Sequence, residues 1–384
     1  MIPRRRGHRN RRFRRMMAIA LPVGLIGLPV GLIVTACATA RPALRHQDAM
    51  STASVDPDAV DDAFTVIFIG DPEARMRGNT AAELGEYVER LLTLGDTRRA
   101  WFELGDGRTH EIDPALVIIG GDISKDRQTS IELDMPIWEP FFAAGVPVLA
   151  GFGNHDWEPE SWGENPSYSL VGHRSNESTT AFTRETYRRS AAITPDLAYR
   201  EVGPTADHGP VTFHATYRGV DIVNFNTFLY QPSYEYPAGW PITCNPFGGG
   251  AGCQTFVSAV PQIEAMESLL AEGASRPAIF VQHYPLSTSD GWWDDYGTTD
   301  TTLAMRKQRL LDMIAGRDEA VFLAGHNHRS SQRAWPVGDR VVAEHVAPYF
   351  GNRGGVLAVL ASPSRGILEV RTLELPAVPT SNPG

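Results

Sequence analysis

Apolar residues along the chain follow two spacings, one typical of buried strands and the other of helices. Short runs rich in β-branched residues predict strands buried on both faces, and they occupy residues 64–70, 116–121, 146–153, 278–282 and 320–325. Apolar positions recur at helical spacing in four segments between these runs: 81–96, 131–145, 261–273 and 301–316. The pattern therefore predicts an alternation of buried strands and helices.

The middle and the end of the chain have a different pattern. Residues 211–228 alternate in polarity around a Tyr-Arg-Gly-Val turn, which predicts an antiparallel hairpin. The stretch 158–210 has weak periodicity and predicts loops with one helix near residues 180–190. Two further strands are expected at 354–362 and 366–375, and no internal repeat is found.

The first 37 residues predict an export signal. Residues 1–17 contain eight arginines and no acid, and residues 18–36 are apolar. The run ends Val-Thr-Ala-Cys, which resembles the lipobox of bacterial lipoproteins, so Cys37 is expected to carry lipid after cleavage. The alternative is an uncleaved membrane anchor. Either way, the body is expected outside the cytoplasm, on the periplasmic or cell-surface side.

The domain organisation follows from the same reading. Residues 38–62 are polar and predict a flexible tether, 63–375 a single large domain, and 376–384 a disordered, proline-containing tail. Cys244 and Cys253 enclose a glycine-rich loop and are expected to form a disulfide in an oxidising compartment, with two free thiols as the alternative.

Charge excludes one class of partner. The chain has a net charge of −10, so removal of the eight N-terminal arginines leaves about −18. Such a body repels polyanions, and nucleic-acid binding is not expected. The expected contacts are a phosphate-ester substrate and the membrane through the N-terminal lipid; nothing in the sequence predicts an oligomer.

Five apolar runs end in a residue that can bind a metal ion. The endings are Asp71, Asp122, Asn154, His283 and His326. Buried strands deliver their terminal side chains to one rim of a sheet, so these groups are expected to converge although they are far apart in sequence. The ordered set predicts a metal site.

These motifs, DPE, GGD, GNHD, VQH and GHNH, resemble the series of the calcineurin-like metallophosphoesterases over roughly residues 64–375. The resemblance implies an α/β (α+β) fold, a four-layer αββα sandwich of two mixed sheets flanked by helices. It also implies two divalent metal ions, Mn, Fe or Zn. One would be bound by Asp71, Asp122 and His328 and the other by Asp122, Asn154, His283 and His326, with Asp122 shared.

The first motif departs from the family pattern, because Glu73 stands where the family has His. If Glu73 binds the metal, a second carboxylate favours a harder ion such as manganese or iron. The alternative is that Glu73 turns away and that this metal is held weakly.

By the same resemblance, His155 is the catalytic general acid, and Asp156 orients it. The nucleophile would be a metal-bound hydroxide that attacks phosphorus directly. Arg75 and Arg127 are candidate phosphate contacts, although an arginine taken alone is more often a solvated side chain. Trp292 and Trp293 are candidates for stacking on a substrate, with local packing as the alternative.

The leading hypothesis is therefore a two-metal hydrolase that cleaves phosphate esters outside the cytoplasm. Two alternatives remain open: a phosphodiesterase acting on nucleotides or lipid head groups, and a catalytically weak, metal-binding lipoprotein. The ligand pattern selects only for phosphate, so the sequence does not distinguish monoester from diester substrates.

Overall fold

The structure is a computed structural model, and it describes most of the region from residue 62 to residue 378. The described ranges are 62–74, 80–94, 101–104, 107–124, 129–153, 156, 168–202, 212–225, 259–271, 276–286, 301–351 and 353–378; within them, side chains of 168–177, 259–262 and 301–306 are not described. Contacts divide the chain into residues 1–51 and 52–384, and every described residue belongs to the second unit. The predicted signal, Cys37, most of the tether, the cysteine pair and the end of the tail lie outside the described residues.

One sheet has five strands in the order β14-β13-β1-β4-β5. Strands β1, β4 and β5 run parallel to one another, whereas β13 is antiparallel to both β1 and β14. The strands are β1 (Phe64–Ile69), β4 (Pro114–Ile119), β5 (Val148–Ala150), β13 (Gly355–Ser362) and β14 (Gly366–Glu374).

The other large sheet has seven strands in the order β11-β12-β10-β9-β8-β7-β6. Strands β12, β10, β9 and β8 form its parallel centre. The strands are β6 (Leu197–Val202), β7 (Thr212–Tyr217), β8 (Val220–Asn224), β9 (Ala278–Gln282), β10 (Ala320–Ala324), β11 (Ser331–Val337) and β12 (Arg340–Val346). A small hairpin pairs β2 (Trp101–Glu103) with β3 (Thr109–Glu111).

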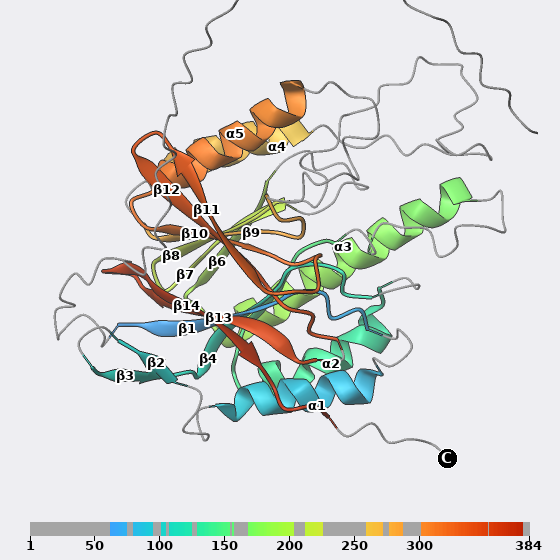
Figure 1. The fold of residues 1–384 in the computed structure, drawn as a ribbon. Helices are drawn as coiled ribbons and strands as arrows, with labels where there is room; N and C mark the ends of the chain where they lie inside the picture. The colour runs from blue at the N-terminus through green and yellow to red at the C-terminus, as the bar shows by residue number, and fades with distance from the viewer. Residues whose placement is uncertain are drawn as a thin grey trace, which may run out of the picture. The chain divides into compact units, whose positions relative to one another are not determined.

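The two large sheets pack face to face, with helices on both outer sides (Figure 1). Side chains of β1 show the division: Val66 and Phe68 point into the core between the sheets, whereas Ile67 and Ile69 pack toward the helices. The helices are α1 (Ala81–Leu92), α2 (Ile131–Ala143), α3 (Tyr168–Ile193), α4 (Ala259–Ala271) and α5 (Thr301–Ala315).

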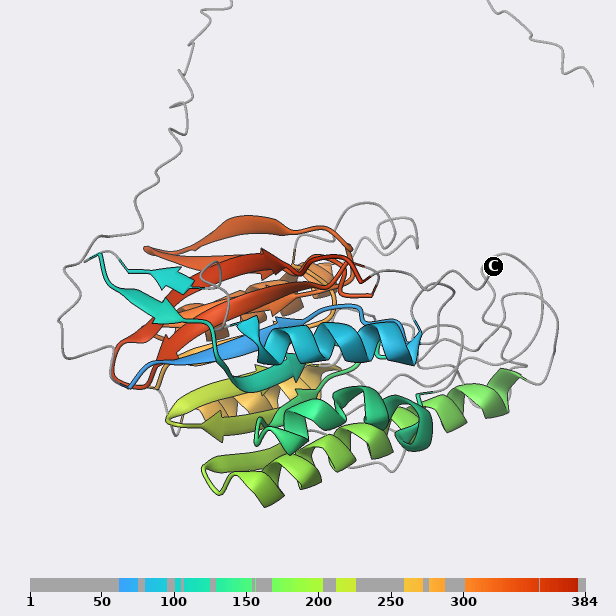
Figure 2. The ribbon, with the colours of Figure 1, turned by 90° about the horizontal axis from the view of Figure 1, so that it is seen from below.

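Figure 2 shows α1 and α2 beside the five-stranded sheet, and α4 and α5 share a core with the outer face of the seven-stranded sheet. The predicted four-layer αββα sandwich is confirmed. The hairpin predicted at 211–228 is also present as β7 and β8, which pair antiparallel.

The region between β5 and β7 contains more regular structure than its sequence pattern predicts. Helix α3 has 26 residues where the pattern predicts only a helix near 180–190, and β6 follows where it predicts loops. The reason is the buried face of α3, which is largely hydroxylic: Thr179, Thr183, Thr186 and Ser190 are all at most 1% exposed. Ser190 Oγ accepts from Val148 N and donates to Val148 O, so this polar stripe fastens the helix to β5.

Among the described residues, none of the helices combines the length and the hydropathy needed to cross a membrane.

Candidate metal centre

The candidate ligands all follow strands at the carboxyl ends of the two parallel arrays. Asp71 and Glu73 follow β1, Asp122 follows β4, His283 follows β9, and His326 and His328 follow β10. The backbone joins these strand ends: Glu73 N donates to Asp122 O at 2.8 Å, and Gly325 N donates to His283 O at 3.0 Å. Side chains from both sheets therefore meet at one edge of the sandwich, where ligands bind in open α/β sheets.

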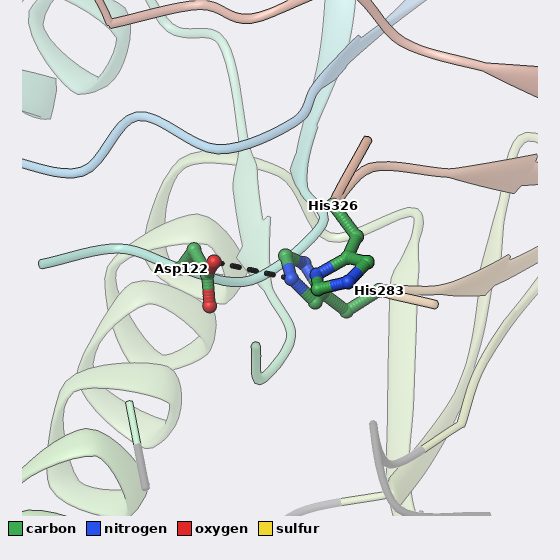
Figure 3. A group of neighbouring side chains, drawn as sticks. All are labelled: Asp122, His283 and His326. Carbon is green, nitrogen blue, oxygen red and sulfur yellow. Dashed lines mark ion pairs between the residues drawn. The ribbon is translucent and has the colours of Figure 1, made fainter. Parts of the chain in front are cut away.

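One group consists of Asp122, His283 and His326, whose ligand atoms all lie within 4.8 Å of one another (Figure 3). His283 Nε2 is 3.2 Å from Asp122 Oδ2, the pair that the dashed line marks. His283 Nδ1 lies 3.1 Å from the carbonyl oxygen of Gly120, which can only accept a hydrogen bond. That contact assigns the proton to Nδ1 and leaves Nε2 directed at Asp122, the orientation that a metal-binding imidazole needs.

A second group consists of Asp71, Glu73 and His328. His328 Nε2 lies 3.5 Å from Asp71 Oδ1 and 3.7 Å from Glu73 Oε1. Glu73 is fully buried, and its other oxygen, Oε2, accepts a hydrogen bond from Tyr349 Oη at 2.6 Å. The side chain of Glu73 thus points into the cluster.

Asp71 connects the two groups. Its Oδ1 lies 3.8 Å from His283 Nε2, the same nitrogen that approaches Asp122. Both oxygens of Asp71 also accept from the backbone N–H of His326, at 2.9 and 2.8 Å. Those candidate ligands of the two predicted metal ions that lie in the described part of the chain therefore belong to one continuous cluster.

The electrostatics of the cluster show strong coupling between buried charges. For His283, burial lowers the pKa but the nearby carboxylates of Asp122 and Asp71 outweigh it and raise the pKa to about 9. Burial, and next the charge of His283, lower the pKa of His326 to about 4. The side chains of Asp71, Glu73 and Asp122 are at most 1% exposed. Buried carboxylates at this density are costly unless cations compensate them.

The backbone of the cluster is strained. Left-handed φ angles are rare outside glycine, and each costs about 1–2 kcal/mol. Such angles occur at six non-glycine residues in the described part of the chain, and five of the six are candidate ligands: Asp71 (53°), Glu73 (43°), Asp122 (51°), His326 (69°) and His328 (56°). Strain of this kind concentrates at functional sites, where the surrounding structure holds it in place.

Two glycines are required by close contacts. A Cβ on Gly153 would lie 2.0 Å from Asp122 Oδ1, and a Cβ on Gly325 would lie 2.7 Å from Asp71 Oδ2. The glycines in GFGNH and LAGHNH therefore allow the backbone of one loop to pack directly on the carboxylate of another.

Asp156 forms hydrogen bonds with both the loop after β4 and the loop after β5. Its carboxylate accepts from Gly153 N at 2.7 Å, Ile123 N at 3.1 Å and Thr129 Oγ1 at 3.2 Å. Burial, and then the charge of Asp122, raise the pKa of Asp156 to about 7. The sequence predicts that Asp156 orients His155; the structure gives it contacts to the loops after β4 and β5, and His155 lies outside the described residues.

Several predicted site residues also lie outside the described residues. They are Asn154, the candidate substrate contacts Arg75, Arg127, Trp292 and Trp293, and the cysteines Cys37, Cys244 and Cys253. His345 lies on β12, a few residues before Tyr349. Within the described ranges it joins no group of three potential metal ligands. Tyr349 is a site residue that sequence reasoning missed, because it lies in no motif.

The donor set fits divalent cations. Carboxylate oxygens and imidazole nitrogens together suit Mn, Fe or Zn better than they suit Ca or Cu(I). Asp122, His283 and His326 could hold one ion, and Asp71, Glu73 and His328 could hold a second. The buried carboxylates and the orientation of the His283 ring, with Nδ1 at the Gly120 carbonyl and Nε2 at Asp122, both match what such ligands require.

No protein-family model matches the chain, and no curated protein matches it. Among solved structures, the NAD nucleotidase of Haemophilus influenzae is 9% identical with a TM-score of 0.36, over 82% of this chain and 50% of that chain. A 5'-nucleotidase precursor of Thermus thermophilus is 12% identical with a TM-score of 0.40, over 83% of this chain and 55% of that chain.

The chain also resembles GAP50, described as the anchor in the inner membrane complex of Plasmodium, with 12% identity and a TM-score of 0.33 over 82% of this chain and 89% of that chain. It spans about half the length of the two nucleotidases. All three TM-scores are below 0.5, so the function proposed below rests on the site alone.

Proposed function

We propose that the protein is a metal-dependent phosphoesterase that binds two divalent cations and hydrolyses phosphate esters. The observation that carries this proposal is the cluster in which Asp122, His283 and His326 are joined through the buried Asp71 to Glu73 and His328. A pair of divalent cations at such a site lowers the pKa of water and neutralises charge on the phosphoryl group.

The chain's own residues supply the rest of the chemistry. Asp122 supplies the carboxylate beside His283, and its position depends on the close contact with Gly153. Asp71 holds the loop after β10 through the backbone N–H of His326, so movement of this loop would displace both histidines. His155 donates a proton to the leaving oxygen, as its place beside Asn154 in the GNHD motif suggests.

The experiment uses the full chain purified in detergent, with metal content measured and a panel of phosphate esters assayed. Chelation removes activity, and Mn²⁺, Fe²⁺ or Zn²⁺ restores it. Asp122→Asn lowers kcat/KM by more than about 100-fold, the upper range for residues that only support a ligand. Comparison of an aryl monoester with a bis-aryl diester separates phosphatase from phosphodiesterase activity.

The matched control is Asp113→Asn, at the opposite end of the same strand. Asp113 immediately precedes β4 and is exposed, whereas Asp122 follows β4 and is buried. Asp113→Asn retains full activity and metal content. Equal activity of the two variants, or activity that survives chelation, contradicts the proposed function.

The proposal extends to location: the chain is exported, and lipid on Cys37 holds it at the cell envelope. The arginine-rich start, the apolar run and the Val-Thr-Ala-Cys ending support this. Mass spectrometry of the N-terminus of membrane-derived protein tests it. A lipid-modified Cys37 at the new N-terminus is expected, and an intact sequence before Cys37 contradicts lipid anchoring.

A further inference from the structure

Tyr349 contacts two candidate ligands at once. Its hydroxyl donates to Glu73 Oε2 at 2.6 Å, and its ring stacks on the ring of His328, with centroids 4.4 Å apart and planes at 11°. Tyr349 is 8% exposed and Glu73 is fully buried. The hydroxyl and the ring of Tyr349 thus contact two members of the same group of ligands.

The segment that carries Tyr349 is itself fixed to the strand ends of the site. Phe350 N donates to Gly70 O at 3.2 Å, and Gly351 N donates to Asp71 O at 3.3 Å. On the other side, Ala347 N donates to Ala324 O at 2.7 Å, at the end of β10. The position of Tyr349 relative to Glu73 and His328 is therefore determined by backbone contacts to both ligand-bearing strands.

We propose that Tyr349 is a positioning residue that holds Glu73 and His328 as ligands of one divalent cation and makes this half of the site selective for an oxygen-preferring ion. The inference rests on the proposed function and deepens it. It explains how Glu73, the third residue of the DPE motif, can serve as a metal ligand.

The hydroxyl matters because a glutamate side chain is flexible. Holding it in one rotamer costs side-chain entropy, and the hydrogen bond to Oε2 offsets that cost. With Oε2 engaged, Oε1 remains directed at His328 Nε2, 3.7 Å away. Glu73 is thereby prepared to bind an ion through one defined oxygen.

The ring matters because it sets the plane of His328. Stacking holds the imidazole with Nε2 at 3.5 Å from Asp71 Oδ1. The resulting half-site contains two carboxylates and one imidazole, whereas the group of Asp122, His283 and His326 contains one carboxylate and two imidazoles. Carboxylate ligands favour Mn²⁺ and Mg²⁺, and imidazole suits Zn²⁺ and Fe²⁺, so the two halves differ in metal preference.

The experiment titrates the full, metal-free chain with Mn²⁺ and separately with Zn²⁺ by calorimetry. Tyr349→Phe keeps the ring and removes only the hydroxyl. We expect it to weaken one of two Mn²⁺-binding steps by about 10–100-fold, the usual effect of removing a group that orients a ligand. The ratio of Mn²⁺ to Zn²⁺ affinity at that step falls, because the weakened donor is the carboxylate.

A double-mutant cycle with Glu73→Ala separates positioning from general packing. If the hydroxyl acts through Glu73, Tyr349→Phe has no further effect on Mn²⁺ affinity once Glu73 is alanine. Circular dichroism and thermal unfolding verify that each variant folds; if Glu73→Ala does not, the comparison of Tyr349→Phe with wild type decides alone.

Tyr199→Phe is the matched control. Its hydroxyl is also buried, makes no hydrogen bond to any described residue, and lies on β6, three strands from β9. We expect this variant to keep wild-type Mn²⁺ affinity at both steps.

The possible failures are distinguishable. Wild-type protein that binds two Mn²⁺ ions, with Tyr349→Phe unchanged in affinity and in Mn²⁺ to Zn²⁺ ratio, overturns the role of Tyr349 and leaves the proposed function standing. Wild-type protein that binds neither ion overturns the proposed function and this inference together.

Discussion

The substitution Gly153→Ala is expected to disable the site without replacing any candidate ligand. The added Cβ would lie 2.0 Å from Asp122 Oδ1 and 2.1 Å from Asp122 N, whereas ordinary van der Waals contact begins at 3.4 Å. The loops after β4 and β5 must therefore separate by more than about 1 Å, and a misplacement of that size at a reacting centre costs about 100-fold in rate. The overpacking lowers the free energy of unfolding by a further ~1–3 kcal/mol.

The assay compares kcat/KM on an aryl phosphate, bound metal and urea unfolding for Gly153→Ala, Gly85→Ala and wild type. Gly85 lies inside α1, and a methyl group added there would meet no atom within 4 Å. The same substitution at Gly85 therefore raises the free energy of unfolding by up to about 1 kcal/mol and leaves activity unchanged. Wild-type activity and metal content in Gly153→Ala would refute the idea that this contact places Asp122.

Three further predictions concern stability. Burial lowers the pKa of His345 to about 4, so the unfolded chain binds a proton that the folded chain does not; the free energy of unfolding falls by up to about 3 kcal/mol as pH drops from 6.5 to 4. His345→Gln should lose that part of the pH dependence in urea titrations, and an unchanged profile contradicts it. Ser190→Ala removes two hydrogen bonds to Val148 and should cost about 1–3 kcal/mol in chemical unfolding; a neutral effect contradicts the anchoring of α3. Chelation should lower the melting temperature, and Mn²⁺ at 100 times its Kd should raise the free energy of unfolding of the metal-free protein by about 2.7 kcal/mol. A melting temperature unchanged by either treatment contradicts cation binding.

The strand endings could be located from sequence because buried parallel strands leave a clear apolar signature. The runs at 278–282 and 320–325 correspond to β9 and β10, and His283 and His326 follow them directly. The carboxyl ends of such strands share an edge of the sheet. The structure accordingly brings Asp71, Asp122, His283 and His326 together.

Helix α3 could not be recognised by its apolar pattern, because the buried positions in its described second half are mostly threonine and serine. The spacing of Thr179, Thr183, Thr186 and Ser190 is helical, but hydroxyl groups do not register as hydrophobic. Ser190 forms its hydrogen bonds with a strand 42 residues away, a contact that only the folded chain defines.

The contacts of Tyr349 with Glu73 and His328 could not be predicted from the sequence either. It stands 276 residues from Glu73 and follows a strand without a glycine–histidine or glycine–aspartate signature. The left-handed backbone at Asp122 and His328 was equally unforeseeable, since these residue types usually adopt other conformations. Both features arise from how the loops pack on one another.

The most direct test of the two-cation site is anomalous diffraction from crystals of the protein grown with Mn²⁺. The account predicts two manganese peaks, one in contact with Asp122, His283 and His326 and the other with Asp71, Glu73 and His328. Crystals that hold these six side chains in place but show no manganese among them would contradict it.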